Sequence, residues 1–347
     1  MKIVCLNPQT DLRWRQLVEG QYSDVFHSPE WMGVLSETYG FEVQAWVILD
    51  NEGTPQAGIP FCRVTDLRGE RIVTLPFSDY CDPLVSNEEQ WDALANHLLR
   101  ENYPVTIRCL HNNLPLVDKR LTEVNKAKWH SVDLEPPLDL IWQGFKDSGR
   151  RAIRKARQTG IEVRLAESEE DLRAFYELHL KLRKYKYRLL AQPYRFFERI
   201  WSHFLEKQKG ALMLAVQNGQ IISGIIFLHW KDTFYYKFNA SSVDYLSNRP
   251  NDFLLWEGIQ LAKAKGSMRL DFGLSDWDQD GLLQYKRKFA TQEKKISFLR
   301  YSPKVKVDDS GAQFGALLPK LTDLFTEDNV PDTVTENAGE ILYRYFT

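Results

Sequence analysis

The chain has 347 residues, a length that predicts about two domains, and its 43% hydrophobic and 13% aromatic residues are sufficient for packed cores. The formal net charge of −2 argues against a general nucleic-acid coat protein, and we expect no DNA partner. The chain shows no leader pattern and no apolar run long enough to span a membrane. We therefore expect a cytoplasmic protein that meets any membrane or wall component at the inner face of the membrane.

The first half of the chain predicts alternating strands and helices. Short strands are expected at both ends of this half, and a hairpin is expected between them. The predicted helices begin at a capping residue or carry an apolar face. The predicted strands are residues 1–6, 44–49, 56–64, 72–75 and 105–110, and the predicted helices are residues 29–39 and 88–100. The turn at residues 50–53, Asp-Asn-Glu-Gly, is typical of a hairpin.

The second half repeats this order. A helix at 194–205 precedes strands at 211–216 and 221–230, which are joined through Asn218-Gly219. Gly53 aligns with Gly219, and Gly58 with Gly224, at one constant offset. This spacing favours two copies of one α/β module in tandem.

Polar or proline-containing segments indicate the domain boundaries. Residues 135–147 contain Pro136-Pro137 and are expected to join the two modules, and residues 303–313 form a second polar linker. We expect residues 1–142 to form the first module and residues 148–305 the second. The end of the chain, residues 331–347, predicts a short helix with an apolar face.

The stretch at 234–290 predicts a strand–loop–helix–strand unit. Residues 234–239 and 268–272 have strand character, and apolar residues recur at helical spacing between Pro250 and Gly266, with Asn251 or Asp252 as the expected cap. The helix start would present backbone N–H groups to an anionic ligand.

The sequence of this stretch resembles that of a known family. The chain is similar to the FemAB-like transferases in the pieces YYKFNAS, RPNDFLLWEGI, DFG and YKRKFA and in the RxxIRKAxxxG segment at 150–160. These transferases are peptidoglycan-bridge aminoacyltransferases and their relatives of the GNAT-like acyltransferase superfamily. The resemblance covers the second half well and the first half faintly. It implies an α/β (α+β) fold of tandem GNAT-like modules, each a mixed sheet flanked by helices, with the C-terminal helix at 314–347 joining the first module and the active-site cleft in the second.

The resemblance also implies a function. The expected activity is transfer of an acyl or aminoacyl group to an amine of a phosphate-bearing cell-envelope precursor or a related acceptor. A coenzyme A-dependent N-acyltransferase acting on a small amine is the enzymatic alternative. A catalytically degenerate module that binds a phosphorylated ligand or tRNA is the alternative without catalysis.

Lys286 is the first catalytic candidate. It lies in an aromatic-Lys-x-x-Phe pattern whose lysine the resemblance places near the transferred acyl group, although Ala290 replaces the family's glycine. An ammonium group beside a developing oxyanion would stabilise it. Lys288 is the competing choice, and an exposed lysine in a basic turn is the alternative without catalysis.

Two acids are candidates for the base that takes a proton from the attacking amine, Asp271 and Asp276. Asp278 and Asp280 are interpreted as parts of a solvated acidic turn.

The candidate substrate-binding residues come from four segments. The basic helix that follows Ser148 offers a cationic face suited to phosphates, unless that face is only solvated. The other candidates lie on the strand at 234–239, at the helix start and beside Lys286. The set is Arg150, Arg151, Arg154, Lys155, Tyr236, Lys237, Asn239, Arg249, Asn251 and Lys288, and residues Arg183, Lys184 and Lys186 extend the basic surface.

No metal site and no tightly bound cofactor are expected, because the seven histidines are scattered and the four cysteines have no CxxC spacing. The donor is expected to be acyl-coenzyme A or aminoacyl-tRNA. The segment Ser247-Asn248-Arg249-Pro250 lacks the glycine-containing loop that GNAT enzymes use for the coenzyme A pyrophosphate, which weakens the coenzyme A alternative.

Overall fold

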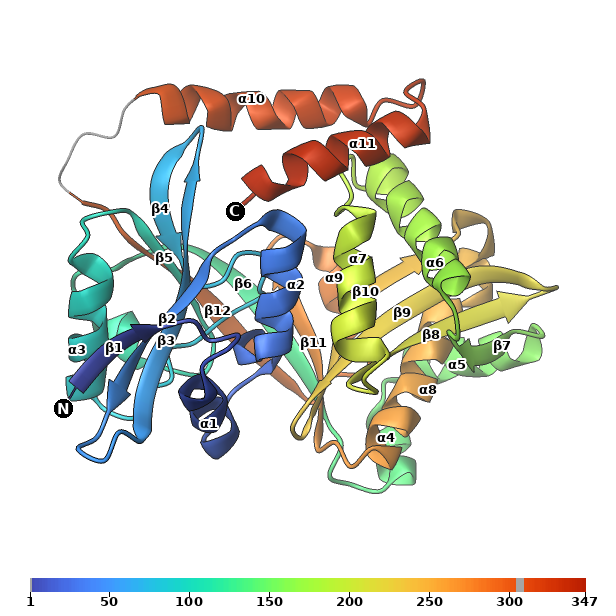
Figure 1. The fold of residues 1–347 in the computed structure, drawn as a ribbon. Helices are drawn as coiled ribbons and strands as arrows, with labels where there is room; N and C mark the ends of the chain where they lie inside the picture. Colours follow the sequence, from blue (N-terminus) through green and yellow to red (C-terminus); the bar gives the residue numbers. More distant parts are fainter. Residues whose placement is uncertain (1, 304–308) are drawn as a thin grey trace. The chain divides into compact units, whose positions relative to one another are not determined.

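A computed structural model describes residues 2–303 and 309–347, with side chains excluded at 309–312. The chain divides into two compact units (Figure 1): residues 1–128, 294–319 and 347 form unit 1, and residues 129–293 and 320–346 form unit 2. The polar linker expected at 303–313 lies partly outside the described residues.

Unit 1 is a mixed sheet with helices. Its strands are β1 (Lys2–Leu6), β2 (Val43–Leu49), β3 (Pro55–Asp66), β4 (Gly69–Val73), β5 (Val105–Cys109) and most of β12 (Gln292–Tyr301), and its helices are α1 (Leu12–Gly20), α2 (Pro29–Tyr39) and α3 (Glu88–Leu99). Strands β1 to β4 pair antiparallel in chain order, whereas β4 and β5, which are connected through α3, pair parallel.

Unit 2 has the same order of strands. Its strands are the second half of β6 (Thr122–Asp133), β7 (Glu162–Leu165), β8 (Gly210–Gln217), β9 (Gln220–Trp230), β10 (Thr233–Ser241) and β11 (Arg269–Asp276). Its helices are α4 (Leu138–Gly144), α5 (Asp147–Gln158), α6 (Glu169–Lys181), α7 (Tyr194–Ile200), α8 (Pro250–Ala264), α9 (Asp280–Lys286) and α11 (Asp332–Leu342). Strands β7 to β10 pair antiparallel, and β10 pairs parallel with β11 after the crossover through α8.

The paired glycines occupy equivalent places in the two units. Gly53 and Gly219 have positive φ, at 85° and 76°, as the two hairpins require. Gly58 lies under α1, where an added Cβ would come within 2.8 Å of Leu17, and Gly224 lies under α6, where it would come within 2.7 Å of Phe175. The predicted duplication of one α/β module is therefore seen in both topology and packing.

The core of unit 2 fixes the two helices that flank the site. Phe227 of β9 packs against Gly258, so α8 lies on the opposite face of the sheet from α6, which packs on Gly224. Helix α5 packs on α8 through a narrow stripe of small or apolar residues, Gly149, Ala152, Ile153 and Ala156.

Several boundaries differ from the sequence-based expectations. Residues 135–147, expected to be only a linker, contain α4 and the first residue of α5. Helix α8 begins at Pro250, and its cap is Arg249 in a left-handed conformation, so neither Asn251 nor Asp252 is the cap. The structure groups residues 320–346 with unit 2, whereas the sequence analysis assigned 314–347 to the first module. The reason is polar contact: Arg173 of α6 forms an ion pair with Glu336 of α11 at 2.9 Å.

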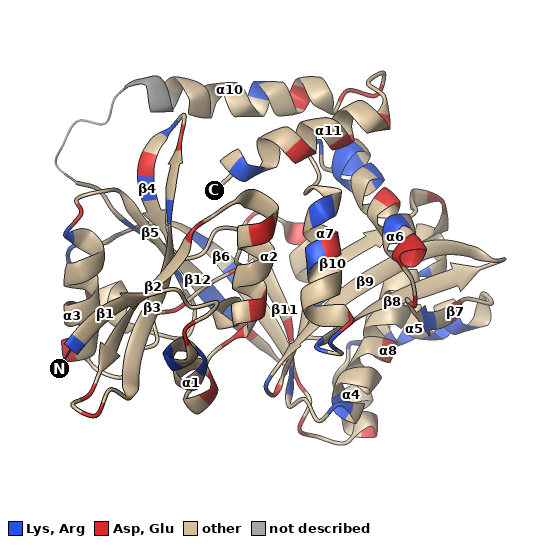
Figure 2. Ribbon diagram, in the orientation of Figure 1, with Lys and Arg blue, Asp and Glu red and all other residues tan. Residues whose placement is uncertain are grey.

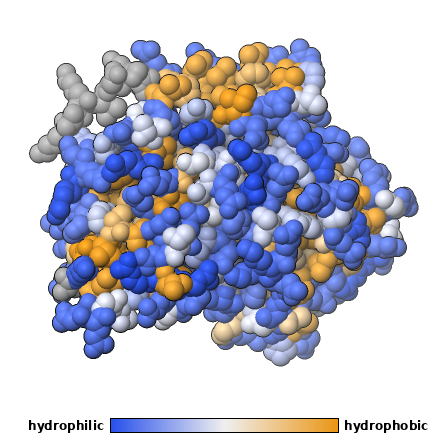
Figure 3. All heavy atoms as spheres, viewed as in Figure 1, coloured by the Kyte–Doolittle hydropathy of each residue, from blue (hydrophilic) through white to orange (hydrophobic). Residues whose placement is uncertain are grey.

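Helix α10 (Asp309–Phe325) carries apolar side chains on its surface (Figure 3), among them Leu317 and Leu324, which are about half exposed. Among the described helices, none has the combined length and apolar character that crossing a membrane requires.

Candidate active site

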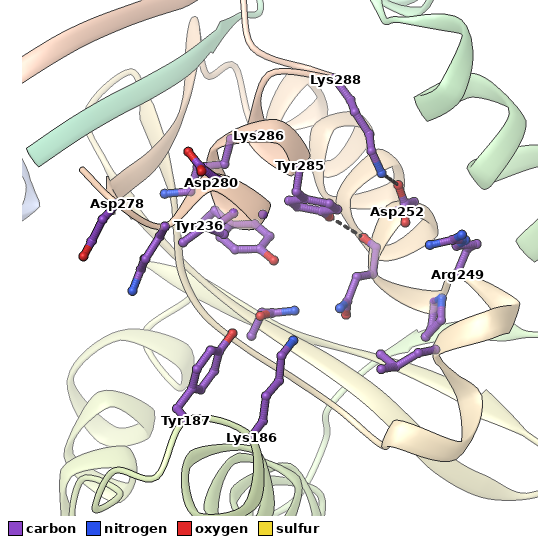
Figure 4. A pocket seen from close by; sticks show the side chains of 17 residues that line it. Lys186, Tyr187, Tyr236, Arg249, Asp252, Asp278, Asp280, Tyr285, Lys286 and Lys288 are labelled. Atoms are coloured by element: carbon purple, nitrogen blue, oxygen red, sulfur yellow. Dashed lines mark hydrogen bonds and ion pairs between the residues drawn. The ribbon is translucent and has the colours of Figure 1, made fainter. Parts of the chain in front are cut away.

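A cavity of about 740 Å³ lies in unit 2 at the start of α8 (Figure 4). Strand β10, the start of α8, the turn before α9, α9 itself and the segment after α6 contribute its walls. The lining residues are Lys186, Tyr187, Tyr236, Asn239, Leu246, Arg249, Pro250, Asn251, Asp252, Asp278, Gln279, Asp280, Gly281, Leu282, Tyr285, Lys286 and Lys288.

Six predicted site residues meet in this cavity: Tyr236, Asn239, Arg249, Asn251, Lys286 and Lys288. Seven do not line it, and these are Arg150, Arg151, Arg154, Lys155, Lys237, Asp271 and Asp276. Asp278 and Asp280, interpreted from the sequence as a solvated turn, are exposed and also line the cavity.

The ammonium group of Lys286 is enclosed by backbone. Only 2% of the residue is exposed, and Nζ donates to the carbonyl oxygens of Phe272 at 2.7 Å, Gly273 at 3.3 Å and Leu274 at 3.0 Å. An ammonium has three N–H donors, so these three contacts can form together. Lys286 therefore fixes the end of β11 behind the cavity wall.

The two acids proposed as bases have other partners. Asp271 is 1% exposed, and its carboxylate accepts from Trp129 Nε1 at 2.8 Å and from the backbone N–H of Gly273 at 2.5 Å. Asp276 is exposed and accepts from Gln279 Nε2 at 3.0 Å. Neither Asp271 nor Asp276 lines the cavity.

Among the described residues, three acids line the cavity, and of these Asp252, which the sequence suggested only as a helix cap, is buried, whereas Asp278 and Asp280 are exposed. Asp252 Oδ1 lies 3.3 Å from Lys288 Nζ, and the residue is 4% exposed. Burial raises the pKa of the Asp252 carboxyl, while the nearby Lys288 ammonium opposes that rise. A carboxylate with a raised pKa is a stronger base for an amine than an exposed aspartate.

Two phenols form the inner wall. Burial is the largest cause of a raised pKa for both Tyr236 and Tyr285. Both hydroxyls therefore stay protonated near neutral pH. Tyr285 donates to the backbone oxygen of Asn251 at 3.3 Å. Protonated phenols are suitable donors to an oxygen that gains negative charge.

The side chain of Asn251 is locked in place below the start of α8. Its Oδ1 accepts from Ser223 Oγ and Ser241 Oγ, both at 2.7 Å. Because the carbonyl end of the amide is fixed by two hydroxyls, its NH₂ end is set in a defined direction.

The basic helix α5 lies outside the cavity, although its start is attached to the site. The backbone N–H of Lys146 donates to Lys288 O at 2.9 Å, and an added Cβ at Gly149 would come within 2.9 Å of Phe289. The outward side of α5 is strongly cationic (Figure 2).

The cations of α5 differ in their partners. Arg150 pairs with Asp147, Arg157 lies 3.4 Å from Glu257, and Arg154 lies over the Trp142 ring at 5.7 Å. Arg151 and Lys155 are exposed and make no ion pair with any residue of the described chain.

Comparison with known proteins identifies the segment that holds the cavity. Residues 144–287 match the family described as Acetyltransferase (GNAT) domain. This match lies within unit 2. All cavity residues except Lys288 fall within this match.

Solved structures share the fold of the whole chain. FemX has a TM-score of 0.67 at 15% identity, with 92% of this chain and 100% of FemX covered. A tandem GNAT protein from the clavulanic acid biosynthesis pathway has a TM-score of 0.57 at 9% identity, with 88% and 99% covered. The C-terminal domain of a putative lysylphosphatidylglycerol synthetase from Agrobacterium fabrum has a TM-score of 0.57 at 14% identity, with 88% and 95% covered. A search of curated proteins by sequence found no match.

These comparisons confirm the expected fold of tandem GNAT-like modules and the resemblance to FemAB-like proteins at the level of fold. Together with the family match they support assignment of the chain to the acyltransferases.

The residues that sequence reasoning missed come from two places. Tyr187, Leu246 and Leu282 carry no motif, and the cavity receives them through tertiary packing. Asp252 and Tyr285 lie inside the quoted pieces RPNDFLLWEGI and YKRKFA, so the resemblance itself could have drawn attention to them.

Proposed function

We propose that this protein transfers an acyl or aminoacyl group to an amine of a cell-envelope precursor or a related acceptor, and that the reaction takes place in the cavity of unit 2. The observation that carries the proposal is the coincidence of the cavity with the matched GNAT segment. The similarity in fold to FemX and to the domain of a putative lysylphosphatidylglycerol synthetase favours an envelope-related acceptor.

In the proposed reaction, the acceptor nitrogen attacks the acyl carbonyl carbon. A C–N bond forms, and the bond from that carbon to the leaving sulfur or oxygen of the donor breaks. Asp252 accepts the proton that the amine loses and passes it to the leaving group, which departs as a thiol or a hydroxyl. The Tyr236 hydroxyl donates to the carbonyl oxygen as negative charge develops on it.

Lys286 and Lys288 have separate roles in this proposal. Lys286 holds the carbonyls at the end of β11, where its buried charge also adds positive potential behind the cavity wall. Lys288 pairs with Asp252 and sets how readily that carboxylate binds a proton.

Two donors are considered, acyl-coenzyme A and aminoacyl-tRNA. The acetyltransferase family match favours the first. The start of α8 lacks the glycine loop that GNAT enzymes use for the coenzyme A pyrophosphate, because Arg249-Pro250 stands in its place, and this disfavours coenzyme A bound in that manner. The exposed cations of α5 would suit the phosphates of a tRNA donor.

The test is incubation of the protein with labelled acetyl-coenzyme A, or with aminoacyl-tRNA, in the presence of small amines and of phosphate-bearing envelope precursors. Label transferred to an envelope precursor supports the proposal. Transfer from acetyl-coenzyme A to small amines alone would favour a coenzyme A-dependent N-acyltransferase. Binding of the donors without transfer in any combination would indicate a catalytically degenerate binding module.

A further inference from the structure

The segment that joins α6 to α7 points its side chains in two directions. It contains η3 (Leu182–Lys186), a π-helical turn closed by the bond from Tyr187 N to Leu182 O at 3.3 Å. Lys186 and Tyr187 line the cavity and point into it (Figure 4). Their neighbours Lys184, Tyr185 and Arg188 contact the end of the chain instead. Such π-helical turns occur frequently at functional sites.

The C-terminal segment 326–332 holds this turn at two points. At the first, Lys184 is fully buried and donates to Val330 O and to Asp332 Oδ1, the latter at 2.8 Å. Asp332 Oδ1 also accepts from Tyr185 at 2.7 Å. The Lys184 ammonium holds the pKa of Asp332 below its usual range, although burial of that carboxyl acts in the other direction.

At the second point, Arg188 donates to Asp328 Oδ1 at 2.7 Å and to Thr326 O at 2.8 Å. Arg188 has a φ of 53°, in the left-handed region that a residue with a side chain rarely adopts. A strained residue persists where its surroundings determine its conformation, and here the contacts with residues 326–328 do so. The conformation of the cavity-lining pair thus depends on the end of the chain.

Two cations that line the cavity form no ion pair with a described residue, although Asp252, Asp278 and Asp280 line the same cavity. Lys186 is exposed and lies 5.3 Å from the centre of the Tyr187 ring, and Arg249 is exposed at the start of α8. Within the described residues, neither side chain forms an ion pair, in contrast to Lys288, which pairs with Asp252. Two cations and the Tyr187 hydroxyl around one cavity match the chemistry of an anionic oxygen group.

We propose that Lys186 and Arg249 bind an anionic group of the substrate, a phosphate or a carboxylate, and that residues 326–332 position Lys186 for this contact. This inference rests on the proposed function, because it assigns part of the same cavity to the substrate. It adds the class of group bound there and a dependence of that site on the C-terminal segment.

The binding test is isothermal titration of pyrophosphate and, separately, of malonate into the full chain at low salt. Lys186→Met and Arg249→Met should each weaken binding by about tenfold or more, since hydrogen bonds to charged groups are the stronger class. The control is Lys207→Met, an exposed lysine of unit 2 outside the cavity, which should bind as the wild type does. Tighter binding of pyrophosphate would identify a phosphate group, and tighter binding of malonate a carboxylate.

The positioning test uses Asp332→Asn, which should weaken binding of the same probe several-fold although Asp332 does not line the cavity. Glu340→Gln is the matched control, because Glu340 is on the same helix and pairs with Arg195 at 3.3 Å, away from the turn. If Asp332 acts through Lys186, then Asp332→Asn should have little further effect in the Lys186→Met background.

The inference is overturned if the wild type binds neither probe, if Lys186→Met binds as tightly as the wild type, or if the effects of Lys186→Met and Asp332→Asn simply add. Because binding of pyrophosphate or malonate needs no turnover, such a result leaves the transferase proposal to its own assay. Conversely, normal anion binding without transfer of any acyl group would contradict the proposed function and keep the anion site.

Discussion

At the scale of single residues, Lys286 is a stabilising group of the fold. Its ammonium is buried and donates to three backbone carbonyls of β11. Lys286→Met would remove these hydrogen bonds, so we expect a loss of about 3 kcal/mol in the free energy of unfolding, measured by urea denaturation. Gln284→Met, at an exposed position on the same helix, should change it by less than about 0.5 kcal/mol.

A different result for the Lys286→Met variant would assign the ammonium another role. If Lys286→Met unfolds at the same urea concentration as the wild type and loses only turnover, on the order of 10²-fold, then the ammonium acts on the substrate and the carbonyl contacts are secondary.

The pH dependence of activity tests the pairing of Asp252 with Lys288. Asp252 must be ionised to accept a proton, so kcat/KM should fall as pH decreases through its pKa, which burial raises above the usual aspartate range. Lys288→Met removes a cation that lowers this pKa, and the fall should therefore move to higher pH. Asp252→Asn should remove this step from the profile. An unchanged profile in both variants would exclude Asp252 as the base.

At the scale of elements, the basic helix α5 has two alternative roles. It either binds a large anionic substrate or is only a solvated face. Arg151→Glu together with Lys155→Glu reverses two exposed charges without an ion pair in the described chain, so stability should change by less than about 1 kcal/mol. If α5 contacts a tRNA donor, the Michaelis constant for that donor should rise and depend less on salt. An unchanged Michaelis constant at low salt would make α5 a solvated face.

Local sequence patterns predicted the elements whose residues determine them. The hairpin glycines, the apolar face of α8 and the aromatic strand β10 carry local signals, and all three were found near their expected residues. Strand β6 and helix α9 were not predicted. The first residues of β6 are exposed and polar, and α9 is a seven-residue helix that follows an acidic turn. Partners distant in sequence stabilise both.

The candidate site was predictable only in part for the same reason. Tyr236, Asn239, Asn251 and Lys288 lie in one continuous stretch that the resemblance marked. Tyr187 comes from a turn about fifty residues earlier, which forms ion pairs with residues 328 and 332. No pattern near Tyr187 encodes that arrangement.

At the scale of the whole molecule, two units share one topology while only the second contains the matched family segment. Both have a hairpin with a left-handed glycine, a strand glycine under a helix, and a parallel strand pair after a crossover helix. The central claim is that the cavity of unit 2 is where the acyl group is transferred.

The most direct test of that claim is to fill the cavity. Asn239 lines it from β10, and Asn239→Trp should reduce label transfer to the acceptor by more than about 10²-fold while the protein stays folded, because the substrate and the indole ring compete for the same volume. The control is Leu165→Trp, at an exposed position beside a separate hollow of unit 2, which should transfer label at the wild-type rate. Transfer at the wild-type rate by folded Asn239→Trp would place the reaction elsewhere and contradict the account.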